Sequence, residues 1–183
     1  MLKQLAGFIL GITITAGMLE GSQSSNSLKS QYHSLNTIDF QKLQARVKNP
    51  VSLNELESAV HEEINNYRRS KGLRPLKLDS RISRQARIHS KDMARGDVPF
   101  SHDGFRTRIK IINRQISYRR AAENVAFNQG FADPADRAVL GWLKSSGHRR
   151  NIEGNFDLTG IGVSKGRGGA YYFTQIFILE EED

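Results

Sequence analysis

Cysteine is absent from the 183 residues of the sequence. No disulfide can therefore stabilise the fold, and the burial of apolar side chains alone must offset the conformational entropy lost on folding. A domain of more than ~100 residues can bury enough apolar surface to do so. Because secreted eukaryotic domains of this size usually carry disulfides, the absence of cysteine favours a bacterial origin.

The linear motifs of common hydrolase and metal sites are also missing. There is no His-Glu-x-x-His segment and no cysteine pair, so no linear metal motif is present. Ser101 precedes His102 but lacks the Gly-x-Ser-x-Gly pattern around a serine nucleophile, which argues against a serine hydrolase. The sequence contains no internal repeat.

Long apolar runs are missing except for one, Leu5 to Leu19, which follows the basic Lys3. A membrane-spanning helix needs roughly 20 apolar residues, and this run is shorter and contains glycines. Residues 1–21 are therefore predicted to be a secretory signal, with passable cleavage sites at Thr15-Ala16-Gly17 and Leu19-Glu20-Gly21, or alternatively an uncleaved anchor in contact with the membrane. Either way we expect a protein that is secreted or anchored outside the cytoplasmic membrane.

Acidic residues are scarce between Arg68 and Arg120, where much of the formal net charge of +8 is concentrated. A basic surface outside a bacterium meets anionic lipid headgroups and wall polymers before it meets nucleic acid. We therefore expect a lipid or an anionic cell-envelope component as partner and disfavour nucleic acid. The alternative is a solvated surface that only keeps the protein soluble.

The organisation of the chain follows from its breaks. Residues 22–50 are rich in Ser, Gln, Asn and Lys and are predicted to be a flexible tether, with a short helix over Ile38–Val47 that Asn49-Pro50 interrupts. A single domain is predicted over 51–183.

Three long helices are predicted in this domain. The capping box Ser52-Leu53-Asn54-Glu55 begins a helix that runs to about Ser70. Asp79 caps a second helix, which Gly96 ends, and 97–104 is then a loop. Asp133-Pro134 begins a third helix, which is predicted to end at Gly147.

Strand patterns are concentrated at the end of the chain. Gly160–Val163 and Tyr171–Ile178 flank a glycine-rich turn and predict a β-hairpin, and further strands are suggested at Val125–Phe127 and Ile109–Ile112. The fold class is therefore α+β, with helices packed against an antiparallel sheet.

Polar clusters at the edges of these elements contain the candidate site residues. The clusters are Phe100-Ser101-His102-Asp103, Ala122-Glu123-Asn124-Val125, Ser146-Gly147-His148-Arg149-Arg150-Asn151 and Tyr172-Phe173-Thr174-Gln175. Imidazoles beside a carboxylate can exchange protons or bind a metal, so His102, Glu123 and His148 are candidates for catalysis or ligand binding. The alternative for each is a hydrogen-bonded residue that fixes a loop. His89 is expected to be a satisfied residue at the margin of the core, and His61 and His33 are expected to be inert.

These clusters, in this order, resemble the CAP superfamily (cysteine-rich secretory protein, antigen 5, pathogenesis-related 1) in its bacterial form. The resemblance covers about Leu53 to Ile178, and its most specific segments are His89-Ser90-x-Asp92-Met93-Ala94, Ala122-Glu123-Asn124-Val125-Ala126 and Trp142-x-x-Ser145-Ser146-Gly147-His148. It implies an α-β-α sandwich with a small antiparallel sheet flanked by helices.

The resemblance also implies a cavity, which in animal and plant members holds two histidines and two acidic residues and sometimes a divalent metal. His102 matches the first histidine and Glu123 the first glutamate. The second acid position falls near Ser145 and the second histidine position at Tyr172, so this tetrad is incomplete. His148 is then a candidate for the second imidazole, and Tyr172 for a ligand-binding residue.

Three functions follow from this interpretation. The leading one is an exported binding module, at the envelope or outside the cell, for a lipid, sterol-like or anionic ligand, since family members are associated with sterol and lipid binding. The second is a hydrolase in which Glu123 or a histidine is the general base. The third is a structural envelope protein. A divalent metal such as zinc, held by His102 and His148, is the one cofactor that the cluster suggests.

Overall fold

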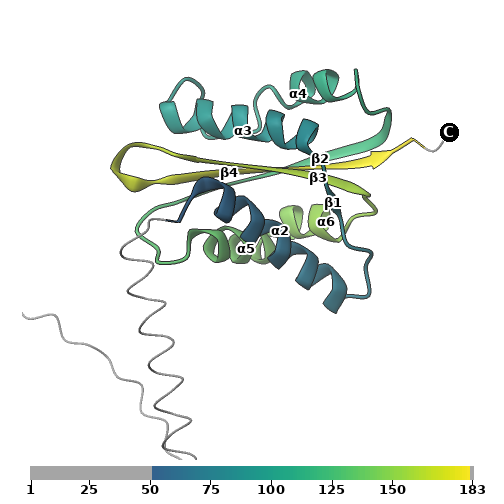
Figure 1. Cartoon of the computed structure of the whole chain (residues 1–183), viewed down its shortest axis with the longest axis horizontal. Coiled ribbons are helices and arrows are strands. Elements are labelled where there is room, and N and C mark those ends of the chain that lie inside the picture. Colours follow the sequence, from purple (N-terminus) through teal and green to yellow (C-terminus); the bar gives the residue numbers. More distant parts are fainter. Residues whose placement is uncertain (1–50, 182–183) are drawn as a thin grey trace, which may run out of the picture. The chain divides into compact units, whose positions relative to one another are not determined.

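A computed structural model of the chain describes residues 51–181 (Figure 1). The predicted signal or anchor at 1–21, the tether at 22–50 and the last two residues, 182–183, lie outside the described residues. Within 51–181, no helix combines the length and apolar character needed to cross a membrane. The elements are, in order, α2 (Leu53–Ser70), β1 (Lys77–Leu78), α3 (Ser80–Arg95), α4 (Phe105–Ile112), β2 (Tyr118–Asn128), α5 (Pro134–Lys144), α6 (Ser146–Glu153), β3 (Leu158–Lys165), a 3₁₀ turn (Arg167–Gly169) and β4 (Tyr171–Glu180).

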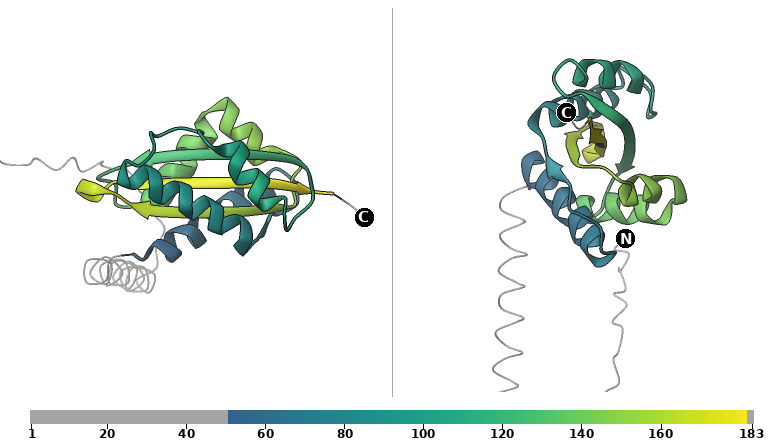
Figure 2. Two further views of the ribbon diagram at one scale, coloured as in Figure 1. Left: turned by 90° about the horizontal axis from the view of Figure 1, so that it is seen from above. Right: turned by 90° about the vertical axis from the view of Figure 1, so that its right-hand side faces the viewer.

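The strands form one small sheet in the order β1-β3-β4-β2. Helices α3 and α4 cover one face of this sheet, and α2, α5 and α6 cover the other (Figures 1 and 2). The predicted α-β-α sandwich of class α+β is confirmed. The sheet is mixed rather than wholly antiparallel, because the two-residue β1 joins β3 in parallel, whereas β4 pairs antiparallel with both β3 and β2.

The predicted helix starts and stops are formed by the side chains that suggested them. Ser52 and Glu55 form the complete capping box of α2, and the Asp79 carboxylate accepts from two backbone N–H groups at the start of α3. Gly96 ends α3 with φ of 79°, a left-handed conformation that glycine adopts without steric cost. Asp133 caps α5 directly before Pro134.

Two predictions of secondary structure are wrong. Ile109–Ile112 is not a strand but the second half of α4, which buries Arg108, Ile109 and Ile112 at helical spacing. The third predicted helix does not continue to Gly147, because Ser145 adopts an extended conformation (φ −87°, ψ 121°) that ends α5 and begins α6.

A hydrophobic cluster lies on each face of the sheet. One joins α2, α5 and α6 to the sheet around Trp142, Phe173 and Phe177, and the other joins α3 and α4 to it around Ile82, Ile109 and Ile176. Helix α3 approaches β3 so closely that a Cβ at Gly162 would collide with the backbone of Ala86 and Arg87. The sheet and α3 therefore form a rigid support for the loop that follows the helix.

Candidate functional site

Glu123 is the centre of the polar site. It lies on β2, the edge strand of the sheet, with only 1% of its side chain exposed. Arg108 of α4 donates from Nε to Oε2 (2.9 Å) and from Nη2 to Oε1 (2.8 Å), a bidentate pair between two buried side chains. The buried carboxylate therefore has a fixed position and a fixed charge partner.

His102 lies in the loop between α3 and α4 and also contacts this carboxylate. Its Nδ1 is 3.0 Å from Glu123 Oε1, and because a carboxylate only accepts, Nδ1 carries the hydrogen. Arg108 Nη1 donates to the carbonyl of Asp103 (2.8 Å), so the same guanidinium also holds the loop. The Nε2 atom of His102 has no hydrogen-bond partner among residues 51–181, and the side chain is 49% exposed.

His148 reaches this site from the opposite layer. Adjacent residues of a strand point to opposite faces, so Glu123 points towards α4 while Asn124 points towards α6. Asn124 Nδ2 donates to the carbonyl of His148 (3.1 Å), and Asn151 Nδ2 donates to Asn124 Oδ1 (2.8 Å). The rings of His102 and His148 consequently meet around the free edge of β2, with centroids 6.2 Å apart.

The electrostatics favour a neutral His148. Burial lowers its pKa below the ordinary 6.5, and the neighbouring His102 lowers it further. Neither nitrogen of this ring has a hydrogen-bond partner among residues 51–181. At neutral pH the site therefore offers an unpaired imidazole that can donate one hydrogen bond and accept another.

Tyr172 lies farther along the sheet. Glu123 is opposite Ile176 on β4, and Tyr172 is four residues away, ~13 Å along the strand. Its ring packs 5.0 Å from that of Phe127, which in turn is 6.3 Å from Phe100. These three rings, called the aromatic row below, extend from the His102 loop along the β2 edge. Thr174 and Gln175 of the same predicted cluster are fully buried and point into the packed layers.

Comparison with known proteins identifies the family and the fold of this chain. The sequence profile of the cysteine-rich secretory protein (CAP) family matches residues 61–177. The chain belongs to this family. The Bacillus subtilis protein YkwD is 35% identical over 132 residues, which are 70% of this chain and 49% of YkwD. The chain spans half or less of the length of the curated relatives it matches.

Two solved structures carry the same fold. An extracellular protein containing an SCP domain from Bacillus anthracis is 29% identical, with a TM-score of 0.56 over 72% of this chain and 45% of that one. An outer surface protein from Borrelia burgdorferi is 19% identical, with a TM-score of 0.60 over 72% of this chain and 97% of that one. The second likeness concerns the fold alone.

In this CAP domain, the residues that were suggested as metal ligands form an incomplete donor set. His102 and His148 offer two imidazoles, whereas both oxygens of Glu123 already accept from Arg108 and His102. A catalytic zinc site has three protein ligands and a structural one has four. No group of three or more His, Cys, Asp or Glu residues within 51–181 is placed to hold a metal. The arrangement does not fit a zinc site, and the chemistry below uses only the chain's own groups.

The other histidines have structural contacts. His89 Nε2 lies 2.9 Å from the carbonyl of Ser101, and burial lowers its pKa, as expected for a satisfied residue at the core margin. His61 Nε2 lies 3.0 Å from the carbonyl of Leu76, so this half-buried ring helps to fix the chain after α2 rather than being inert. His33 lies outside the described residues.

Sequence reasoning missed Arg108, although this residue organises the CAP site. A signal was present: Phe105, Arg108, Ile109 and Ile112 are spaced by three, one and three residues, which is one face of a helix. An arginine on a buried face requires an acidic partner in the interior. In the structure that partner is Glu123, whose side chain is 1% exposed.

Proposed function

We propose that this CAP domain is an exported binding module at the cell envelope, and that the neighbouring rings of His102 and His148 take the polar end of an amphiphilic ligand, a lipid or a sterol-like molecule. The observation that carries the proposal is the pair of unpaired imidazole edges together with the exposed aromatic row, whose first ring, Phe100, lies in the same loop as His102. Phe100 is 51% exposed and Phe127 48% exposed. Exposed rings next to hydrogen-bonding groups suit a ligand with one apolar and one polar part.

The state of Glu123 supports binding over catalysis. A general base must reach the proton it removes with a free lone pair. Three N–H groups already occupy three of the about four lone-pair sites of this carboxylate, and with 1% of the side chain exposed the remaining site does not face solvent. The role that the contacts give to Glu123 is to orient His102, whose Nε2 is then the atom that meets the ligand.

The test is a titration of purified full-length protein with a dansyl-labelled fatty acid kept below its critical micelle concentration. We expect saturable binding that weakens at least threefold in His102→Ala and in Phe127→Ala, because each change removes one half of the amphiphilic surface. All variants share residues 1–50, so any contribution of that segment cancels.

The matched control is Leu140→Ala, which removes an apolar side chain of similar exposure (41%) from α5 outside the aromatic row. It should bind as the wild type does. Pelleting with phosphatidylglycerol vesicles at two salt concentrations separates the charge-driven part, which falls as salt rises. Binding that is absent in the wild type, or equal in all four proteins, would overturn the proposal.

His148 supports a second candidate, a hydrolase, because a neutral imidazole without a hydrogen-bond partner is suited to act as a general base on water. The purified protein would be assayed on peptide, ester and glycan substrates. A rate that falls at least 100-fold in His148→Ala would establish this activity, whereas inactivity on all three panels would count against it.

A further inference from the structure

The outer face of α3 is uniformly basic. Five of its exposed side chains are cationic and none is acidic, the exposed residues being Ser80, Arg81, Arg84, Arg87, Ile88, Lys91 and Arg95. The single acid of this helix, Asp92, is half-buried. Helix α4 adds Arg106 and Lys110 and contains no acid. The layer formed by α3 and α4 therefore carries positive charge with few acidic residues of its own to balance it. Helix α2, in contrast, contains four acidic residues beside its basic ones, namely Glu55, Glu57, Glu62 and Glu63.

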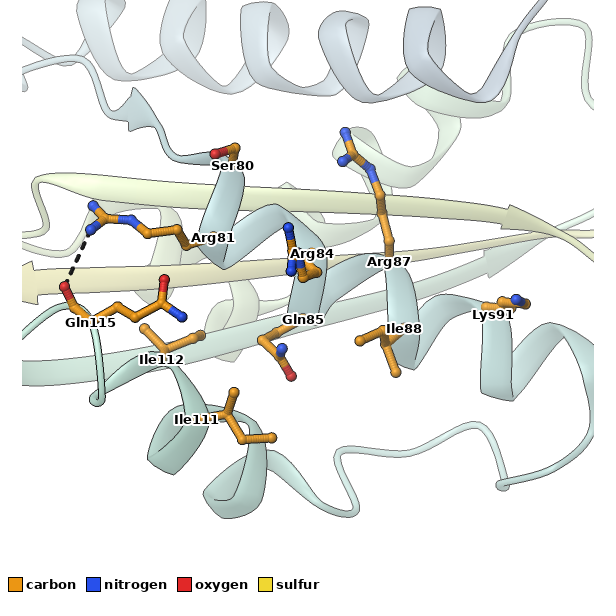
Figure 3. Close-up of a pocket in the computed structure, with 10 residues that line it drawn as sticks. All are labelled: Ser80, Arg81, Arg84, Gln85, Arg87, Ile88, Lys91, Ile111, Ile112 and Gln115. Atoms are coloured by element: carbon orange, nitrogen blue, oxygen red, sulfur yellow. Dashed lines mark hydrogen bonds between the residues drawn. The ribbon is translucent and has the colours of Figure 1, made fainter.

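A groove of about 480 Å³ runs along this layer between α3 and α4 (Figure 3). Its apolar part consists of Ile88, which is 46% exposed, with Ile111 and Ile112 across from it. Arg84 and Lys91 flank this isoleucine surface. The lining residues include neither His102, Glu123 and His148 nor the aromatic row, so this α3–α4 groove is a separate site.

The cations of the groove differ in their partners. Arg81 is paired with Asp79, and Arg87 points away from the groove towards Glu57 of α2, to which it donates (Figure 3). Arg84 and Lys91 have no acidic partner within residues 51–181. They are seven residues apart on the same side of α3, about 10.5 Å along the helix axis. Two uncompensated cations at this separation favour a ligand with anionic groups repeated along its length.

We infer that the α3–α4 groove binds an anionic polyol-phosphate chain, a phosphodiester polymer without bases. Arg84 and Lys91 would each contact a phosphate, and the aliphatic linker between the phosphates would lie on the exposed Ile88 and the half-buried Ile111. The inference rests on the proposed location at the cell envelope, where such a polymer would be met, but not on ligand binding at His102 and His148.

Two other polyanionic partners suit the groove less well. Single-stranded nucleic acid is held largely by stacking of bases on aromatic side chains, and no lining residue is aromatic. A flat bilayer surface cannot enter a groove, and peripheral helices that bind bilayers present several exposed large apolar side chains, whereas α3 has one, Ile88. A flexible chain can follow the groove and reach both cations.

The experiment measures fluorescence anisotropy of a labelled poly(glycerol phosphate) oligomer titrated with full-length protein at 50 to 300 mM salt. Each phosphate contact contributes about 0.7 to the slope of log K against log salt for a single-stranded polyanion. Arg84→Gln with Lys91→Gln should therefore reduce the slope by about 1.4 and the affinity near 0.15 M salt roughly tenfold. Glutamine preserves helix propensity, so α3 should stay folded.

The matched control is Lys144→Gln with Arg150→Gln, which removes the same charge from exposed positions on α5 and α6. It should keep the slope within about 0.3 of the wild type. His102→Ala should also bind the polymer normally. A failure of the proposed amphiphile binding at His102 and His148 would therefore not imply that the α3–α4 groove fails to bind the polymer. Equal losses in both double variants would show general charge attraction and overturn the inference. Tighter binding to oligo(dT) with the same number of phosphates, or to phosphatidylglycerol vesicles alone, would overturn it too.

Discussion

Replacing Glu123 by glutamine tests whether the Arg108–Glu123 pair holds α4, β2 and the His102 loop together. The side chains are 9% and 1% exposed, so the change leaves a buried guanidinium without a counter-charge. Removing one partner of a buried ion pair lowers the free energy of unfolding by about 3 to 5 kcal/mol. The amide oxygen of the glutamine still accepts one hydrogen bond from Arg108, so we expect a loss at the lower end of this range, about 3 kcal/mol. For a domain of this size that corresponds to a melting temperature lower by about 10 °C.

Urea and thermal unfolding followed by circular dichroism measure this loss. Glu57→Gln is the matched control, because Glu57 is similarly buried but its partner Arg87 is 48% exposed and stays hydrated when the charge is removed. We expect about 1 kcal/mol there. Arg108→Met and Glu123→Gln would also be combined in a double variant. Its loss in free energy of unfolding should be smaller, by at least about 1 kcal/mol, than the sum of the losses of the two single variants. Equal losses for the two glutamine variants, or strict additivity, would refute the reasoning.

Three further predictions concern other parts of the domain. Gly162→Ala should destabilise the domain by about 3 kcal/mol or more in urea unfolding, because the new Cβ meets the α3 backbone. Gly141→Ala is the control, and it should stabilise the domain slightly because its Cβ meets nothing within 4 Å. Similar behaviour of the two variants would contradict the close packing of α3 on β3. Burial, with the charges of Asp136, Asp133 and Glu62, raises the pKa of Glu63 to about 7. The native state therefore holds this proton more tightly than the unfolded chain, so the free energy of unfolding falls as pH rises from about 4.5 through 7. Glu63→Gln should remove up to about 1 kcal/mol of that loss between pH 5 and 8, and parallel pH profiles of the free energy of unfolding for the variant and the wild type would exclude this role. Calorimetric titration with zinc should show no saturable heat at micromolar protein, because only two imidazoles are available as ligands among residues 51–181. A 1:1 binding isotherm that His102→Ala abolishes would show instead that the site binds zinc.

The elements that the sequence predicted well are those whose ends depend on local side chains. Ser52, Asp79 and Asp133 accept from backbone N–H groups a few residues away, and Gly96 supplies a positive φ, so each signal lies within one turn of the structure it causes. The hairpin of β3 and β4 was predictable for the same reason.

Helix α4 was mistaken for a strand because its local signals are weak or misleading. Gly104 precedes it without a side-chain cap, and Ile109, Ile111 and Ile112 are β-branched residues that favour strands. Its burial depends on Glu123, fifteen residues further along the chain, which neutralises Arg108. A charge partner so far away in sequence cannot be recognised from periodicity alone.

The sequence predicted which residues belong to the site but not how they are arranged in space. His102 and Glu123 were suggested together, and the structure places them in contact. The approach of His148 depends on the break at Ser145, which turns α6 towards the edge of β2, and Ser145 makes no side-chain cap bond that would mark the break in the sequence. The separation of Tyr172 depends on strand register, which is set by the whole sheet.

The close contact between α3 and β3 has a consequence for how related sequences diverge. Any residue other than glycine adds a Cβ at Gly160 or Gly162, and at both positions that atom collides with helix backbone that has no room to move. During divergence these two positions should therefore be more restricted than His102, whose side chain is 49% exposed. Two glycines separated by one residue in the penultimate strand would then identify distant relatives with this helix arrangement, whatever those relatives bind.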